Sequence, residues 1–272
     1  MSEYGNPARY WEERLGRNFD LRGAGYAVLG ASFNAVMYAA RRSALDRALG
    51  ATGGGVAGLR VLEVGCGTGF YTEFCHSQAV AAYTGVDLTQ VSVNRLAAHY
   101  SGFQFVRAEL GSDGFALDAQ FDLVLVADVL FHIVETERFQ RALAQLVGCV
   151  SPGGRLIISD VFPALAQRSA EHVQLRSWAE YEAALSRLRM QVAHVEPIFA
   201  VLQPPVSLAS ATVPWRVYTQ LWRHGLLRAA RSNVLDRSLP RVLAWLDRHV
   251  FLRRVGLSAP NSKWLVACFR AE

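Results

Sequence analysis

Three glycines at alternate positions, Gly65, Gly67 and Gly69, are the first residues of this chain whose spacing indicates chemistry. They follow a largely apolar run, 61–64, and precede a stretch with a helix-like pattern, 70–79. Glycine tolerates unusual backbone dihedral angles, and because it lacks Cβ it lets a ligand lie against the backbone. A strand, a glycine-rich turn and a helix in this order present backbone N–H groups to a ligand. The segment therefore predicts a binding turn.

The spacing excludes two common phosphate-binding turns. A dinucleotide fingerprint requires G-x-G-x-x-G, but here the third glycine comes one residue early and Phe70 stands where that pattern has Gly or Ala. A Walker loop requires a Gly-Lys-Ser/Thr sequence, which does not follow. Asp87 ends a second predicted strand, 82–87, where an acidic residue can hydrogen-bond ribose hydroxyls. The two features together favour a ligand that carries a ribose.

The segment from Glu63 to Gly69, Glu-Val-Gly-Cys-Gly-Thr-Gly, resembles motif I of class I S-adenosylmethionine (SAM)-dependent methyltransferases. The family pattern is roughly E/D-x-G-x-G-x-G. The segment 121–132, a strand followed by Ala-Asp-Val-Leu-Phe-His, resembles motif IV of the same family. It lacks the Asn/Asp-Pro-Pro-aromatic tetrapeptide of enzymes that methylate DNA bases and protein amides. The resemblance covers about residues 55–165 and implies a small-molecule methyltransferase with SAM as its cofactor.

The resemblance also implies which residues hold SAM. The motif I turn would contact the cofactor, and Asp87 would bind its ribose. Two leucines would flank the adenine, and Glu109 would stand where the family often has an Asp. Residues after the fourth strand would orient the methionine part, and tyrosines from the N-terminal segment would close over it, with Trp11 and Phe19 as further candidates. The expected cofactor contacts are Glu63, Gly65, Cys66, Gly67, Gly69, Asp87, Leu88, Glu109, Leu110, Ala127, Asp128, Tyr10 and Tyr26.

Three side chains are candidates for moving a proton during methyl transfer to an oxygen: His132, Asp128 and His172. An ordinary histidine pKa near 6.5 suits a general base. His132 follows the fourth strand, at the carboxyl edge where open α/β sheets bind ligands, and is the preferred base. Asp128 could instead orient the amino group of SAM. A metal-assisted mechanism through Asp128 and Asp160 is an alternative, although Val161 stands where such enzymes carry Asn; no metal is expected.

The elements that must position these residues form an α/β pattern. Strands are predicted at 61–64, 82–87, 103–107, 121–126, 155–160, about 191–202 and 263–269, with a turn at 151–154. A capping box, Ser177 to Glu180, begins a helix after the fifth strand. The resemblance implies a Rossmann-like fold, a mostly parallel seven-stranded sheet of order 3-2-1-4-5-7-6.

The chain is expected to divide into an N-terminal helical cap, 1–58, a SAM-binding core, 59–205, a basic helical insert, 206–261, and a last core strand, 262–272. The cap contains a predicted short helix from Pro7 and a longer one at 34–49, with an irregular stretch, 19–30, between them. Two helices are predicted in the insert, about 214–231 and 239–255. The insert carries nine arginines and only two acids, Asp236 and Asp247.

Three interpretations of the insert stay open: a lid whose arginines face an anionic substrate, a helix pair that lies on a membrane surface, or a pair that packs on the sheet or forms a homodimer with a solvated basic face. The formal charge of the whole chain is +5, so the remainder is slightly acidic, and no nucleic-acid motif is present. We therefore expect a small-molecule partner, with an anionic compound as one candidate class, and no nucleic acid.

Composition agrees with a cytoplasmic enzyme. The chain has 272 residues, 51% of them hydrophobic, and no apolar run as long as the roughly 18–20 residues of a membrane span. No secretory leader is evident, and the four cysteines lack metal-ligand spacing, so we expect reduced thiols. The expected function is SAM-dependent O-methylation in secondary, sugar or lipid metabolism. The alternatives are C- or N-methylation of an anionic isoprenoid or lipid-linked substrate, and a non-catalytic SAM-binding module.

Overall fold

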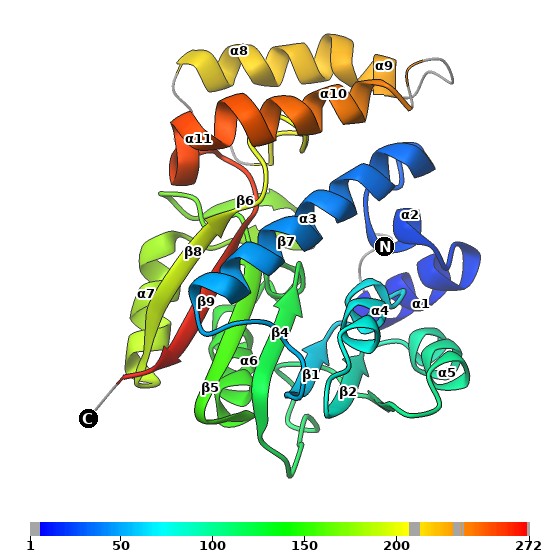
Figure 1. Ribbon diagram of the computed structural model, residues 1–272, viewed down its shortest axis with the longest axis vertical. Coiled ribbons are helices and arrows are strands. Elements are labelled where there is room, and N and C mark those ends of the chain that lie inside the picture. The colour runs from blue at the N-terminus through cyan, green and yellow to red at the C-terminus, as the bar shows by residue number, and fades with distance from the viewer. Residues whose placement is uncertain (1–5, 207–212, 231–234, 236, 271–272) are drawn as a thin grey trace.

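The computed structural model describes residues 6–206, 213–230, 235 and 237–270. Its centre is a seven-stranded sheet in the order β3-β2-β1-β4-β5-β9-β8. All neighbours from β3 to β5 are parallel, whereas β9 runs antiparallel to both β5 and β8. Numbered along the chain within this sheet, the order is 3-2-1-4-5-7-6, and the predicted α/β fold class is confirmed (Figure 1). The strands are β1 (Arg60–Val64), β2 (Ala82–Asp87), β3 (Gln104–Arg107), β4 (Phe121–Ala127), β5 (Val150–Asp160), β8 (Met190–Pro197) and β9 (Lys263–Phe269).

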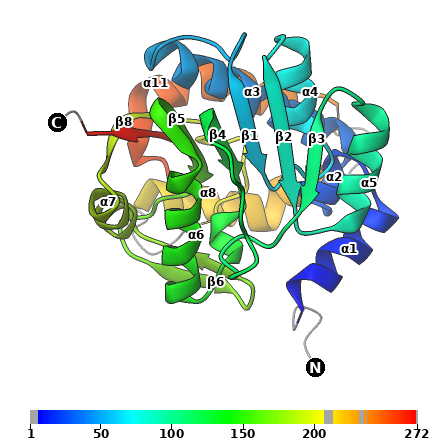
Figure 2. The same ribbon diagram turned by 90° about the horizontal axis from the view of Figure 1, so that it is seen from below.

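Helices cover both faces of this sheet, as Figure 2 shows. Alternate strand residues feed two apolar clusters: Val61 and Leu123 face α3 (Ala31–Ala51) and α4 (Phe70–Ser77), whereas Leu62 and Val124 face α6 (Thr136–Gly148) and α7 (Trp178–Arg187). Since both faces are buried, the central strands are continuous apolar runs, which is typical of parallel sheets. The predicted capping box is present at the start of α7.

The N-terminal part is helical and precedes the sheet. Helix α1 (Pro7–Arg17) begins with Asn6, whose side chain accepts a hydrogen bond from the Arg9 amide. The stretch predicted to be irregular contains a four-residue helix, α2 (Leu21–Ala24), capped in the same way by Asp20. The long helix α3 begins three residues earlier than predicted. Helix α5 (Gln90–His99) completes this side and contacts α1.

Two strand boundaries differ from the prediction by more than one residue, and one element was not predicted. Strand β5 begins at Val150 and runs through the predicted turn, with an irregular register opposite β4 and a left-handed Gly153. Strand β8 ends at Pro197, so the apolar residues 198–202 leave the sheet, although all five are buried. A hairpin that was not predicted, β6 (Gln167–Ala170) and β7 (Val173–Leu175), follows β5.

The insert consists of two helical rods that lie side by side above α3 (Figure 1). The first is α8 (Val213–Leu221), the π-helical turn η2 (Trp222–Leu226) and α9 (Leu227–Ala230); the second is α10 (Leu239–Leu246), the π-helical turn η3 (Asp247–Phe251) and α11 (Leu252–Val255). A 3-10 turn, η4 (Gly256–Ser258), then leads to β9. Arg231 and Asp236 lie outside the described residues.

Buried polar residues fasten the last strand and the insert. The Asp247 carboxylate accepts hydrogen bonds from the amides of Ala200, Val201 and Leu202, at 3.1, 2.6 and 3.0 Å. Lys263, the only lysine of the chain, donates from Nζ to three backbone carbonyl oxygens at 2.7–3.1 Å. These bonds satisfy groups that would otherwise be costly to bury.

Candidate functional site

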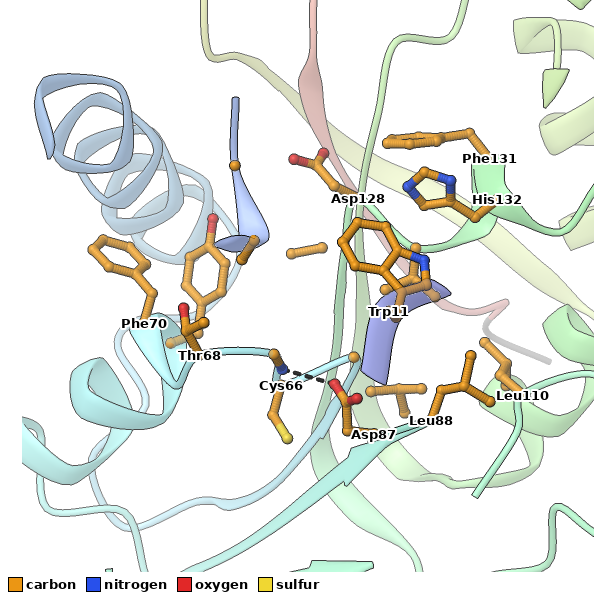
Figure 3. A pocket seen from close by; sticks show the side chains of 18 of the residues that line it. Trp11, Cys66, Thr68, Phe70, Asp87, Leu88, Leu110, Asp128, Phe131 and His132 are labelled. Carbon is orange, nitrogen blue, oxygen red and sulfur yellow. Dashed lines mark hydrogen bonds between the residues drawn. The ribbon is translucent and has the colours of Figure 1, made fainter. Parts of the chain in front are cut away.

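A cavity of about 410 Å³ opens at the carboxyl ends of β1, β2 and β4. Open α/β sheets bind ligands at this edge, and the volume lies in the range of small-molecule sites. The cavity wall is shared by the glycine turn, the N-terminal helices and the 3-10 turn η1 (Leu130–His132) that follows β4. Figure 3 shows Trp11 between Asp128 and His132 on one side and Asp87 and Leu88 on the other.

The glycine turn has the backbone that the sequence predicted. Gly65, Gly67 and Gly69 all have positive φ angles, 84°, 53° and 86°. A Cβ on Gly65 would lie 2.3 Å from a Val129 methyl carbon, and one on Gly69 would lie 2.5 Å from Leu96. A Cβ on Gly67 would meet nothing nearer than Ala24, at 3.7 Å. Two glycines therefore allow close packing, whereas Gly67 keeps the turn open on the side of the cavity.

Asp87 is fixed beside this turn. Its Oδ2 accepts a hydrogen bond of 2.8 Å from the Gly67 amide (Figure 3), and its Oδ1 accepts from the amide and hydroxyl of Thr89 at 2.9 and 2.7 Å. Burial raises the pKa of the Asp87 carboxyl, while these donors act in the opposite direction. A carboxylate oxygen can accept more than one hydrogen bond, so the side chain keeps acceptor capacity toward the cavity.

Glu63 also lines the cavity, but its carboxyl is turned beneath the glycine turn. Oε2 accepts hydrogen bonds from the hydroxyls of Tyr83 and of Thr72, the latter at 3.2 Å. Burial raises the pKa of Glu63 to about 8, although both donors favour the charged form. This side chain therefore ties β1 to β2 and α4 below the cavity.

The predicted adenine flank is brought together. Leu88 and Leu110 both line the cavity and follow the ends of β2 and β3. Glu109 lies there too, as an ion pair with Arg138 of α6. Cys66 lines the turn with its thiol buried, and burial raises the pKa of that thiol well above its usual value.

Asp128 lies directly after β4 and takes part in a network that the sequence did not reveal. Its φ angle is 58°, an uncommon conformation for a residue other than glycine. One oxygen accepts from Ser159 at 2.6 Å, and the other pairs with the buried Arg41 of α3 at 2.7 Å. Ala127 and Asp128 thus border the cavity, with the carboxylate held by a guanidinium. Arg41 is the one charged residue among the buried residues of its helix, and it lies between Met37 and Leu45; that position is the signal that could have identified it.

The two predicted histidines face each other. The rings of His132 and His172 stack with 5.6 Å between centroids, and Nδ1 of His132 lies 3.1 Å from the His172 carbonyl oxygen. Since a carbonyl oxygen only accepts, this contact assigns the proton of neutral His132 to Nδ1 and leaves Nε2 as an acceptor. Removal from water lowers the pKa of His132 to about 4 and also lowers that of His172. The Trp11 ring meets His132 edge-on at 5.3 Å.

The tyrosines are placed differently from one another. Tyr26 lines the cavity, and its hydroxyl accepts from Gln203 at 3.0 Å. Tyr10 lies outside the cavity lining, beside Trp11, which takes the position expected for it. Tyr38 and Tyr71, which sequence reasoning missed, line the same wall; among the described residues no hydrogen-bond partner meets the buried Tyr71 hydroxyl. Phe19, the fourth aromatic candidate, stacks under Arg95.

The alternative with a metal held by two aspartates fits this geometry poorly. The Asp160 carboxyl is buried and accepts hydrogen bonds from the Tyr181 hydroxyl at 2.5 Å and the Val161 amide at 2.6 Å. Burial raises its pKa to about 7. Within the described ranges no three His, Cys, Asp or Glu side chains gather as a metal site would require. Asp160 therefore belongs to the interior, not to the cavity.

Comparison with known proteins identifies a methyltransferase domain in the core. A methyltransferase domain model matches residues 61–154. The chain is 34% identical over 202 residues to phthiotriol/phenolphthiotriol dimycocerosates methyltransferase 1 of Mycobacterium ulcerans, covering 72% of this chain and 61% of that protein. It is 33% identical over 110 residues to ubiquinone biosynthesis O-methyltransferase of Stutzerimonas stutzeri, covering 39% of this chain and 46% of that protein.

A third relative, tRNA U34 carboxymethyltransferase of Methylococcus capsulatus, is 34% identical over 107 residues, 38% of this chain and 32% of that protein. The chain thus spans between about a third and three fifths of the length of these relatives.

Solved structures agree on the fold. The complex of DhpI with S-adenosylhomocysteine superposes with a TM-score of 0.52 at 24% identity, over 70% of this chain and 89% of that one. The [4+2]-cyclase SpnF superposes with a TM-score of 0.50 at 18% identity, over 79% of this chain and 76% of that one. Proteins with different reactions share this fold, so the likeness supports architecture alone. With the domain match at residues 61–154, it follows that the core of this chain contains a methyltransferase domain of Rossmann-like fold.

Proposed function

We propose that this protein transfers a methyl group from SAM to a small-molecule acceptor. The observation that carries the proposal is the cavity in which the motif I turn, Asp87 and the residues after β4 meet within a methyltransferase domain. A sulfonium methyl is already activated, so the protein must chiefly align the acceptor with it and exclude water. Positioning of this kind can supply much of a rate enhancement.

The residues present fit the cofactor. Asp87 has spare acceptor capacity for a ribose diol, and the open backbone at Gly67 leaves room for a ligand against the turn. Leu88 and Leu110 offer apolar contact for an adenine. The Asp128 carboxylate, fixed by Arg41, would orient the methionine amino group. SAM would supply the methyl group, and these side chains would hold it.

His132 supports transfer to an oxygen. With a pKa lowered to about 4, the ring is neutral at physiological pH, and its Nε2 is the nitrogen able to accept a proton. A base this weak does not deprotonate a hydroxyl in advance; it accepts the proton as the hydroxyl becomes acidic during methyl transfer. His172 fixes the ring and its tautomer, and so acts as a positioning residue.

One observation favours an anionic acceptor. Arg14 lines the cavity and, among the described residues, has no carboxylate partner; its guanidinium donates to the Tyr10 hydroxyl at 2.9 Å and the Gly25 carbonyl at 2.6 Å. A guanidinium suits a phosphate or carboxylate. This supports the second candidate, C- or N-methylation of an anionic isoprenoid or lipid-linked compound, for which no proton acceptor of the His132 kind is needed.

The test uses SAM labelled on its methyl group, with the protein and a lysate of its host, and counts label in aqueous, organic and macromolecular fractions. Asp87→Ala should abolish SAM binding and transfer. His132→Asn should lower O-methyl transfer at least about 100-fold, the usual contribution of a general base, with SAM affinity retained, whereas the exposed His99→Asn should change neither.

Full activity of His132→Asn would favour C- or N-methylation, and label in the macromolecular fraction would contradict a small-molecule acceptor. SAM binding with no product in any fraction would contradict catalysis and favour a SAM-binding module.

A further inference from the structure

The outward side of the insert is basic without compensation. Eight arginines of the described insert are exposed, and none forms an ion pair with a described residue. Elsewhere, exposed arginines commonly do, as Arg47 does with Glu196 and Arg60 with Asp122. The one described acid of the two rods, Asp247, is buried and occupied by three amides. The eight are Arg216, Arg223, Arg228, Arg237, Arg241, Arg248, Arg253 and Arg254.

Large apolar side chains stand among these arginines. Val217 and Leu221 are four residues apart on α8 and 55% and 58% exposed; Val242 and Trp245 are three apart on α10 and 54% and 57% exposed. Residues at these spacings lie on one side of a helix. Each rod therefore carries a pair of exposed apolar side chains, and contiguous exposed apolar groups mark interaction sites. We call these four residues and the eight arginines the outer face.

The outer face is held rigidly, because the opposite side of each rod is packed. Tyr218 and Trp222 are buried, and both donate to the Val201 carbonyl oxygen. Leu243 and Asp247 are buried on the second rod. The outer face is therefore not a core side turned outward by loose packing. Each rod therefore has one side that packs against the rest of the protein and one side that is exposed.

We propose that the outer face docks on the surface of an anionic lipid bilayer. Arginine side chains can reach lipid phosphates while Trp245 and Leu221 enter the boundary between headgroups and acyl chains, the usual composition of interfacial helices. Apolar side chains gain little from a nucleic-acid backbone, and a second copy of the same face would bring two sets of arginines together. No helix in the described part of the chain is long and apolar enough to cross a bilayer, so the rods lie on it.

The insert is attached beside the cavity wall. Gln203 and Val206 line the cavity and precede α8 in the chain. The Asp247 clasp on residues 200–202 fixes the second rod to the same segment. Binding to the bilayer does not depend on methyl transfer and can be measured without SAM.

The experiment is cosedimentation with vesicles of phosphatidylcholine alone and of phosphatidylcholine mixed equally with phosphatidylglycerol. The full chain should pellet with the mixed vesicles, lose that binding in high salt, and stay in solution with phosphatidylcholine alone. Arg241→Glu with Arg248→Glu should weaken partitioning at least about 30-fold, since each cation near an anionic surface contributes roughly a factor of five. Trp245→Ser should weaken it by about tenfold, through lost burial of an aromatic ring.

Matched controls lie outside the insert. Arg187→Glu with Arg189→Glu makes the same charge change on exposed residues, and Leu165→Ser removes a side chain that is 62% exposed; both should bind like the unaltered chain, and thermal melts should show every variant folded. Equal binding by the Arg241/Arg248 variant, or no binding to mixed vesicles, would overturn the proposal. So would a dimer in solution that Trp245→Ser dissociates, because it would identify a second copy as the occupant.

Discussion

The backbone at Gly65 combines two constraints, a φ angle of 84° and a neighbouring Val129 methyl carbon at 2.3 Å from any added Cβ. The first disfavours every L-residue by roughly 1–2 kcal/mol, and the second adds overpacking, typically about 1–3 kcal/mol. Gly67 lacks the second constraint. The same residue type thus has different roles two positions apart: packing at Gly65, and access for a ligand at Gly67.

Gly65→Ala should therefore lower the free energy of unfolding by about 2–5 kcal/mol and abolish SAM binding, because the turn must shift. Gly50→Ala is the matched control, since Gly50 lies exposed in α3 with nothing within 4 Å of an added Cβ. It should raise stability by up to about 1 kcal/mol. Urea unfolding and SAM titration measure both; an unperturbed Gly65→Ala would contradict the packing argument.

Among the elements, η3 is attached to the 200–202 segment by the hydrogen bonds of Asp247. Three buried amides share one carboxylate, so loss of Asp247 would leave all three without acceptors. A buried donor without a partner costs about 1–3 kcal/mol. The rod that carries Trp245 is the element that would come loose.

Asp247→Ala should accordingly lower the free energy of unfolding by about 3 kcal/mol or more. Hydrogen exchange should speed up at the amides of Ala200, Val201 and Leu202 before it does in β4 or β5. Asp118→Ala, at an exposed position, is the control and should leave exchange unchanged. Protection of the three amides that is equal in both variants would show that the clasp does not hold the segment.

The central strands could be predicted because parallel strands buried on both faces leave continuous apolar runs, and the glycine turn because its backbone needs glycine. The 198–202 segment was wrongly assigned to a strand: its residues are buried, but three of its amides donate to Asp247 and not to a neighbouring strand. The strands of the hairpin β6–β7 are only four and three residues long, too short to show a periodic pattern. The π-helical turns leave no periodic signal.

For the site, local patterns found Asp87 and His132, whereas the pairing of Arg41 with Asp128 could not be found because 87 positions separate the two residues in the chain. Tyr71 is similar, since only the packed structure shows that its hydroxyl has no described partner. Sequence reasoning thus reached the residues that a turn or strand end positions, and missed those that tertiary packing positions.

The stability of the whole molecule depends on pH through buried titratable groups. Burial raises the pKa of Glu63 from 4.5 to about 8. Between these values the folded chain keeps a proton that the unfolded chain has released, so this residue lowers stability as pH rises, by at most about 1.4 kcal/mol per pH unit. His132, with its pKa lowered to about 4 from 6.5, acts in the opposite direction between those values.

Glu63→Gln removes the contribution of Glu63 to the pH dependence of stability and leaves that of His132. The stability of the variant relative to the unaltered chain should increase steadily from pH 4.5 to pH 8, because Gln has no proton to release, while the His132 contribution cancels in the difference. Urea unfolding at several pH values measures it. The exposed Leu165→Ser, which removes no titratable group, should give a difference that does not depend on pH; the same flat result for Glu63→Gln would show that Glu63 is charged in the fold.

The solitary lysine has a use of its own. Lys263 is 5% exposed, its ammonium is surrounded by carbonyl oxygens, and burial lowers its pKa to about 8. An amine-reactive acylating reagent cannot reach Nζ while β9 is paired in the sheet, even at a mildly alkaline pH where the amine is deprotonated. Acylation of Lys263, read by peptide mass, would therefore time the opening of the last strand, and slower acylation with SAM present would show that ligand and strand are energetically linked.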